Sequence, residues 1–215
     1  MRRALLAAAL AACAGALVAH ATAKSSGATA ALPVFESADL TPIWRSADEL
    51  RAQGDRALPE FSFQDQAGRS VTRTTLAGRV VVANFFFAGC STLCPRLRSS
   101  MARVRDAFAS DPRLLLISHS VTPKTDSLPL LAAYARANGI DGERWRLLTG
   151  PEAMLRRFAR EGYLLPAPEV DARGVMHTEQ FVLLDACQRV RGYYNGTLAL
   201  EVDHLIGDVK ALLAS

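Results

Sequence analysis

The sequence predicts an α/β domain, and three observations carry this prediction. Apolar residues make up 50% of the 215 residues and charged residues 21%, a balance that suits a globular chain and excludes intrinsic disorder. Continuous apolar runs of strand length, such as 80–87, indicate buried strands covered on both faces. Apolar residues that recur at helical spacing between these runs, as over 97–108, indicate helices that pack back on a sheet.

Residues 1–23 are predicted to be a secretory signal peptide or a membrane anchor. Arg2 and Arg3 precede an apolar run over 4–19, and small residues follow at the spacing of a cleavage site. Cleavage is favoured, because the run is shorter than the roughly 20 residues that cross a bilayer core. A lipoprotein-type box ending at Cys13 is an alternative. All three interpretations imply that the rest of the chain is exported. We expect the protein in a bacterial periplasm, soluble or anchored to the inner membrane.

Residues 24–55 are expected to form a tether, and residues 56–215 the folded domain. The tether mixes Ser, Ala, Pro and charged residues, with Trp44 as its large anchor. The domain is expected to open with a β-hairpin, because apolar residues alternate over 61–63 and a polar turn over 65–68 leads to a second short strand.

The rest of the domain alternates between strands and helices. The elements are predicted in this order: a central strand over 80–87, a helix over 95–108, a strand over 114–118, a helix over 128–138, a short strand over 145–149, a helix over 151–161, a hairpin of 181–185 with 190–194, and a final helix over 202–213. This order is that of a thioredoxin-like fold with an added N-terminal β-hairpin.

Two cysteines follow the central strand, at the sheet edge where parallel strands place functional residues. Cys90 and Cys94 lie in the sequence CSTLCP, four positions apart. On a helix this spacing brings two side chains to one face, close enough to bind one ion or, after a small adjustment, to form a disulfide. Cys94 is expected at the helix start, where unpaired backbone N–H groups favour a thiolate. A purely stabilising disulfide is the alternative, although so short a loop constrains the unfolded chain little.

His177 is predicted to approach this cysteine pair. It precedes the strand 181–185, which runs antiparallel to the central strand in a thioredoxin-like topology, so its entry faces the cysteine corner. Two soft thiolates suit Cu(I), an added imidazole permits Cu(II), and zinc accepts the same ligands. Since a disulfide cannot bind the ion, metal binding and thiol redox chemistry would share the same two sulfurs.

These residues resemble the SCO/SenC family over roughly residue 55 to the end. The matching segments are CSTLCP at 90–95, the stretch 120–126, HTEQFVLLD at 177–185 and RGYYNG at 191–196. The resemblance implies a thioredoxin fold, copper bound by Cys90, Cys94 and His177, and an N-terminal membrane anchor. Its implied partners are the cytochrome c oxidase subunit that carries the CuA site and other periplasmic copper carriers. Many members have an acid at the position of Thr122, whereas Asp126 is retained.

The leading functional hypothesis is a copper metallochaperone, a carrier rather than an enzyme with turnover. The alternative is a thiol-disulfide oxidoreductase that keeps the cysteines of a partner reduced, with Cys90 and Cys94 as its redox-active pair. Spacing disfavours this as the sole role, because thioredoxin-type reductants have two intervening residues. A peroxidase is disfavoured further, since Phe87 stands where a proline is expected.

Two other side chains at or near the sheet could be chemically active. His119 follows the strand 114–118 at the functional edge and is an additional or rival ligand, although we expect a loop residue without metal. Cys187 is expected to be a tolerated turn residue, with a bridge to a partner chain as the alternative.

The charge of the chain excludes nucleic acid as an expected partner. The formal net charge is +4, the basic residues are scattered, and Arg2 and Arg3 belong to the leader. Arg98, Arg103 and Arg105 are expected to form a solvated helix face, with an acidic docking surface on a partner as the alternative.

Overall fold

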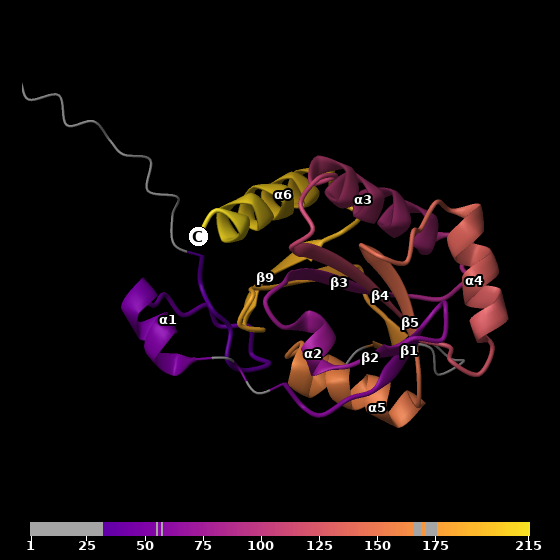
Figure 1. The fold of residues 1–215 in the computed structure, drawn as a ribbon, viewed down its shortest axis with the longest axis horizontal. Coiled ribbons are helices and arrows are strands. Elements are labelled where there is room, and N and C mark those ends of the chain that lie inside the picture. The colour runs from indigo at the N-terminus through magenta and orange to yellow at the C-terminus, as the bar shows by residue number, and fades with distance from the viewer. Residues whose placement is uncertain (1–31, 55, 57, 166–168, 171–175) are drawn as a thin grey trace, which may run out of the picture.

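A mixed sheet of seven strands forms the centre of the molecule, in the order β2-β1-β5-β4-β3-β8-β9 (Figure 1). The computed structural model describes residues 32–215 except 55, 57, 166–168 and 171–175, so the predicted leader lies outside the described residues. The strands of this sheet are β1 (Phe63–Asp65), β2 (Ser70–Val71), β3 (Val80–Phe86), β4 (Leu114–Ser120), β5 (Trp145–Thr149), β8 (Gln180–Leu184) and β9 (Val190–Asn195). A separate pair is formed by β6 (Glu169–Val170) and β7 (Met176–His177).

Helices cover both faces of the sheet (Figure 1). They are α1 (Ala47–Gln53), α2 (Arg73–Leu76), α3 (Leu93–Ala107), α4 (Leu128–Ala137), α5 (Glu152–Arg157) with a π-helical continuation η1 (Phe158–Gly162), and α6 (Ala199–Leu213). Buried residues of α3, α4 and α6 pack on one face, and those of α2, α5 and η1 on the other.

The predicted thioredoxin-like α/β architecture is confirmed by the strand pairing. β3 runs parallel to β4, β4 runs parallel to β5, and β8 runs antiparallel to β3. Alternate residues of β3 enter the two cores, with Val81 and Phe85 on one face and Val82 and Phe86 on the other. All seven residues of β3 are buried, Asn84 included, which explains why the other six are apolar.

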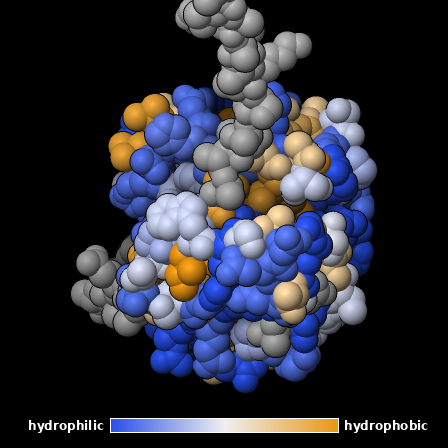
Figure 2. Space-filling model, turned by 90° about the vertical axis from the view of Figure 1, so that its left-hand side faces the viewer, coloured by the Kyte–Doolittle hydropathy of each residue, from blue (hydrophilic) through white to orange (hydrophobic). Residues whose placement is uncertain are grey.

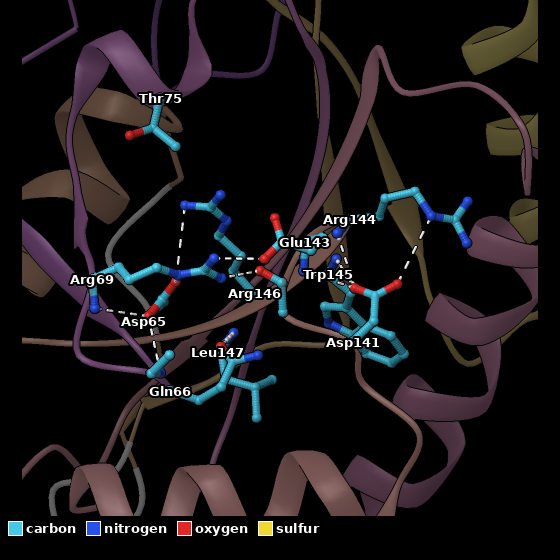
Figure 3. A network of polar contacts seen from close by, with 12 residues as sticks. Asp65, Gln66, Arg69, Thr75, Asp141, Glu143, Arg144, Trp145, Arg146 and Leu147 are labelled. Carbon is cyan, nitrogen blue, oxygen red and sulfur yellow. Dashed lines mark hydrogen bonds and ion pairs between the residues drawn. The ribbon is translucent and has the colours of Figure 1, made fainter.

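The N-terminal hairpin of the domain is joined to the sheet by a polar network (Figure 3). β1 pairs antiparallel with both β2 and β5. The buried Asp65 carboxylate accepts hydrogen bonds from the Arg69 backbone and side chain, and Arg69 also donates to Glu143 at 2.6 Å. Gln66 accepts a hydrogen bond from the backbone N–H of Leu147 at 2.8 Å. These contacts fix the register of the hairpin against β5.

The described part of the predicted tether packs on the domain. Val34 is buried, and the backbone N–H of Phe35 donates to Val190 of the edge strand β9 at 3.0 Å. Arg191 donates to the carbonyls of residues 32 and 33. Residues 32–54 are therefore held by the sheet edge and do not form a free tether. Trp44, expected as an anchor, is 67% exposed, so Val34 has that role.

The surface on the α1 side of the molecule is mostly hydrophilic, with small separate apolar patches (Figure 2). Single exposed apolar residues such as Trp44 are normal on a protein surface. Within the described part of the chain, none of the helices has the length and hydropathy needed to cross a membrane.

Candidate metal centre

The loop after β3 places the Cys90 sulfur at the mouth of α3. The helix begins at Leu93, and Thr92 before it makes no side-chain cap. The Cys90 sulfur instead accepts a hydrogen bond from the backbone N–H of Cys94 at 3.3 Å. The prediction that both cysteines lie on one face of the helix is therefore wrong, because Cys90 lies before the helix begins. Its sulfur still faces Cys94, because it occupies the place of a capping oxygen.

The two thiols have opposite acidities. Burial disfavours ionisation of Cys90, but hydrogen bonds from the Cys94 thiol and from three backbone N–H groups outweigh it and lower the pKa of Cys90 to about 7. Burial raises the pKa of Cys94 to about 12, reinforced by its hydrogen bond to Cys90 and by the nearby charges of Cys90 and Asp126. The thiolate predicted at Cys94 therefore belongs to Cys90, since Cys94 is only 6% exposed.

Alkylation of the reduced protein should therefore discriminate between the two cysteines. The rate at Cys90 should rise with pH to half its maximum near pH 7, because the thiolate is the reacting form, while Cys94 stays unmodified through pH 9. Mass spectrometry after anaerobic iodoacetamide treatment measures this, with Cys187→Ser removing the signal of the third described cysteine. Faster modification of Cys94 than of Cys90 would contradict the assignment.

A cavity of about 90 Å³ lies beside the cysteine pair. Its lining is mixed polar and apolar and is formed by Phe85, Phe86, Phe87, Cys90, Thr92, Leu93, Cys94, Leu97, Val121 and Thr178. Both cysteines are present as thiols and are not joined in a disulfide. A small cavity with two sulfurs in its wall can hold a soft cation.

The segment that follows β7 reaches this cavity through Thr178. The backbone of His177 belongs to β7 and pairs with Glu169, whereas its side chain lies outside what the structure describes. The two predicted sulfur ligands are thus together, and the residue after the predicted imidazole ligand lines the same cavity. Among the side chains that the structure describes, no three His, Cys, Asp or Glu groups form a metal cluster.

Contacts to the end of β9 fix the chain after His177, a feature that sequence reasoning missed. The Glu179 carboxylate accepts a hydrogen bond from the Asn195 side chain at 2.8 Å, and the Glu179 carbonyl accepts one from the backbone N–H of Gly196 at 2.8 Å. A side chain at Gly196 would meet the Phe181 ring at 2.5 Å, so only glycine allows this approach. The signal available in the sequence was the polar run next to His177.

His119 belongs to the core and not to a loop, which corrects the prediction. β4 extends to Ser120, and His119 is 1% exposed among aromatic rings, including Phe85 stacked at 5.4 Å. Its Nε2 shares a hydrogen bond of 2.7 Å with the Tyr163 hydroxyl. Burial lowers the pKa of His119 to about 3, so the ring is neutral. The structure gives no support to a role as a rival ligand, because the ring points into the core opposite α3.

Tyr163→Phe should therefore destabilise the fold without changing the cavity. The buried Nδ1 of His119 already has no described partner, and the substitution would leave Nε2 unpartnered as well. We expect a loss of about 1–3 kcal/mol in the free energy of unfolding, measured by urea denaturation at pH 7. Tyr193→Phe is the matched control, since its hydroxyl donates only to a backbone carbonyl. An unchanged unfolding midpoint for Tyr163→Phe would show that the pair contributes nothing.

Arg103, Arg105 and Cys187 are not among the residues that line the cavity. Arg103 pairs with Asp203 at 2.6 Å, and Arg105 donates to the Gly139 carbonyl, so the expected solvated face is partly engaged in contacts between elements. Cys187 lies in the turn between β8 and β9 and is half-buried, as expected of a turn residue.

Comparisons with known proteins agree with this fold. A family model described as SCO1/SenC matches residues 50–214. A SCO1 protein homolog of Bacillus subtilis (strain 168) is 30% identical over 155 residues, covering 70% of this chain and 80% of that protein. The structure of BsSco, described as a cytochrome c oxidase assembly protein with a disulfide switch, is 28% identical with a TM-score of 0.64, covering 74% of this chain and 95% of the other.

The copper-bound structure of ScoI from Bradyrhizobium japonicum shares the fold, with a TM-score of 0.58 and 22% identity over 73% of this chain and 99% of that one. The family model covers most of the sequence, including both cysteines and His177. The chain therefore belongs to the SCO1/SenC family.

Proposed function

We propose that this protein binds one copper ion through Cys90, Cys94 and His177 and carries it to the CuA site of cytochrome c oxidase. The observation that carries this proposal is the pair of unbridged thiols at a helix mouth, in the wall of a small cavity that Thr178 also lines. Family membership supports it, since BsSco is described as a cytochrome c oxidase assembly protein and ScoI has been solved with copper bound.

The acidities of the thiols set how copper would be captured. Cys90 is partly ionised at neutral pH and half-exposed, so it supplies the first thiolate. Cys94 is a buried thiol that must lose its proton when it becomes a ligand, because the thiolate is the metal-binding form. Two soft sulfurs satisfy Cu(I), and the imidazole of His177 adds the ligand that Cu(II) favours.

Copper stoichiometry tests the proposal. The reduced protein, titrated anaerobically with Cu(I) and separately with Cu(II), is expected to bind one ion, with a sulfur-to-copper charge-transfer band in the Cu(II) form. Binding that leaves this band absent would show that the sulfurs are not ligands. Further ions bound with equal affinity would show that the site is not selective.

A thiol-disulfide oxidoreductase is the second candidate, and the unequal acidities favour it. The Cys90 thiolate could attack a sulfur of a partner disulfide, releasing one partner thiolate and forming a mixed disulfide. Cys94, once deprotonated, would then attack Cys90, release the second partner thiolate and leave a Cys90–Cys94 disulfide. This reaction uses no imidazole, so reductase activity that survives in His177→Ala would separate it from Cu(II) binding.

The compartment belongs to the same proposal. We infer export to a bacterial periplasm, with residues 1–23 acting as signal peptide or anchor, and with other periplasmic copper carriers as donors. Fractionation of cells that produce the full chain tests this, and recovery in the cytoplasm would contradict it.

A further inference from the structure

Asp126 is a buried carboxylate without a cationic partner in the described part of the chain. Its side chain is 2% exposed, and no described Lys, Arg or His forms an ion pair with it. By contrast, the buried Asp65 and Asp185 each pair with arginine at 3.1 Å or less. Burying an ionised group without a counter-charge is costly unless hydrogen bonds compensate, so the contacts of Asp126 require an explanation.

One oxygen of this carboxylate joins the two loops that form the walls of the cavity. Oδ2 of Asp126 accepts a hydrogen bond from the backbone N–H of Ala88 at 3.2 Å and another from the Ser120 hydroxyl at 2.7 Å. The Ser120 oxygen in turn accepts the backbone N–H of Thr122 at 3.2 Å. The chain after β3 is thereby tied to the chain after β4.

This junction lies next to the sulfur site. Ala88 is two residues before Cys90. The backbone N–H of Val121 donates to the carbonyl of Phe86 at 2.9 Å, and both of these residues line the cavity. The Asp126 charge also acts on Cys94, where it disfavours ionisation of the thiol. Asp126 is therefore connected to the Cys90 loop through Ala88 and acts on Cys94 through its charge, although it does not line the cavity.

We propose that Asp126 is a positioning residue for the cysteine loop: its Oδ2 oxygen holds Ala88 against the end of β4 and thereby fixes the Cys90 sulfur at the mouth of α3. This proposal concerns the same site as the copper-binding function. The affinity measurements below depend on that function being correct. Its geometric part can be tested on the metal-free protein.

The two substitutions Asp126→Asn and Asp126→Ala separate a hydrogen-bond acceptor from a charge. An asparagine retains one oxygen that can accept from both Ala88 and Ser120, whereas alanine removes the junction. We expect Asp126→Ala to weaken Cu(I) binding by roughly 10–100-fold, the range seen when outer-shell partners of metal ligands are removed. Asp126→Asn should remain within about 3-fold of the wild type, since the geometry survives.

The metal-free readout is the pH profile of Cys90 alkylation. If the loop loosens in Asp126→Ala, the Cys90 sulfur leaves the backbone N–H groups that favour its thiolate, and the profile should move to higher pH. Asp126→Asn should keep the wild-type profile. Asp185→Asn is the matched control for stability, because Asp185 is buried at the opposite end of the sheet, where β8 ends beside the start of β3.

The outcomes decide the proposal as follows. Wild-type Cu(I) affinity and alkylation profiles in both Asp126 variants overturn it. Equal impairment of Asp126→Asn and Asp126→Ala also overturns it, because the charge of Asp126 would then matter rather than its hydrogen bonds. If Asp126→Ala does not fold, Ser120→Ala removes one of the two donors and should shift the same alkylation profile; an unshifted profile overturns the proposal. A wild-type protein that binds no copper refutes the copper function alone, and the alkylation profiles still decide the positioning role.

Discussion

Replacing either Cys90 or Cys94 by serine is expected to abolish tight copper binding. Each substitution exchanges a soft sulfur for a hard hydroxyl of similar size, and the remaining sulfur and imidazole suit Cu(I) much less well than two thiolates. The loss of Cu(I) affinity should exceed the roughly 100-fold upper range for outer-shell partners, because a ligand itself is removed. Competition with a chromogenic Cu(I) chelator under anaerobic conditions measures the affinity.

Cys187→Ser is the matched control for both variants. Cys187 lies in the turn that follows β8, which pairs with the start of β3, whereas Cys90 follows the end of β3. This variant should bind one copper ion with wild-type affinity. Thermal unfolding must be recorded as well, since a serine hydroxyl at the buried Cys94 position costs stability if it finds no partner. If Cys94→Ser retained wild-type Cu(I) affinity, the buried thiol of Cys94 would not be a copper ligand.

His177→Ala should impair Cu(II) binding far more than Cu(I) binding. Two thiolates satisfy Cu(I), whereas Cu(II) gains strongly from an imidazole nitrogen. We expect the sulfur-to-copper charge-transfer band to shift or disappear and the Cu(II) affinity to fall by more than about 100-fold, while Cu(I) affinity changes by less than about 10-fold. Optical and electron paramagnetic resonance titrations measure the two oxidation states separately.

His204→Ala controls for the loss of a histidine elsewhere. His204 is exposed on α6, so His204→Ala should bind Cu(I) and Cu(II) with wild-type affinity. Equal losses of Cu(I) and Cu(II) affinity in His177→Ala would indicate a general disturbance of the site, and an unchanged Cu(II) spectrum would show that His177 is not a ligand.

The sheet could be predicted from the sequence because its signal is local. Both β3 and β4 consist entirely of buried residues, and the apolar residues that dominate β3 and begin β4 identified them without knowledge of their neighbours. The final helix was found in the same way, because Val202, Leu205 and Val209 face the core at helical spacing.

Properties that depend on tertiary contacts could not be read from local patterns. The position of Cys94 at a helix start predicted an acidic thiol, but burial in the folded core has the opposite effect and leaves Cys90 as the acidic group. His119 sits near the end of an apolar run, and only the packing of Tyr163 and Phe85 against it shows that it is a core residue. The polar composition of 32–54 likewise concealed its pairing with β9.

X-ray absorption at the copper edge of the Cu(II)-loaded protein tests the central claim most directly. Two sulfur scatterers and one imidazole are expected in the wild type, with the imidazole signal lost in His177→Ala. In Cys90→Ser, which binds copper only weakly, the copper that is bound at saturation should have one sulfur fewer. A copper environment of nitrogen and oxygen alone, or one that does not change in these two variants, would contradict the account.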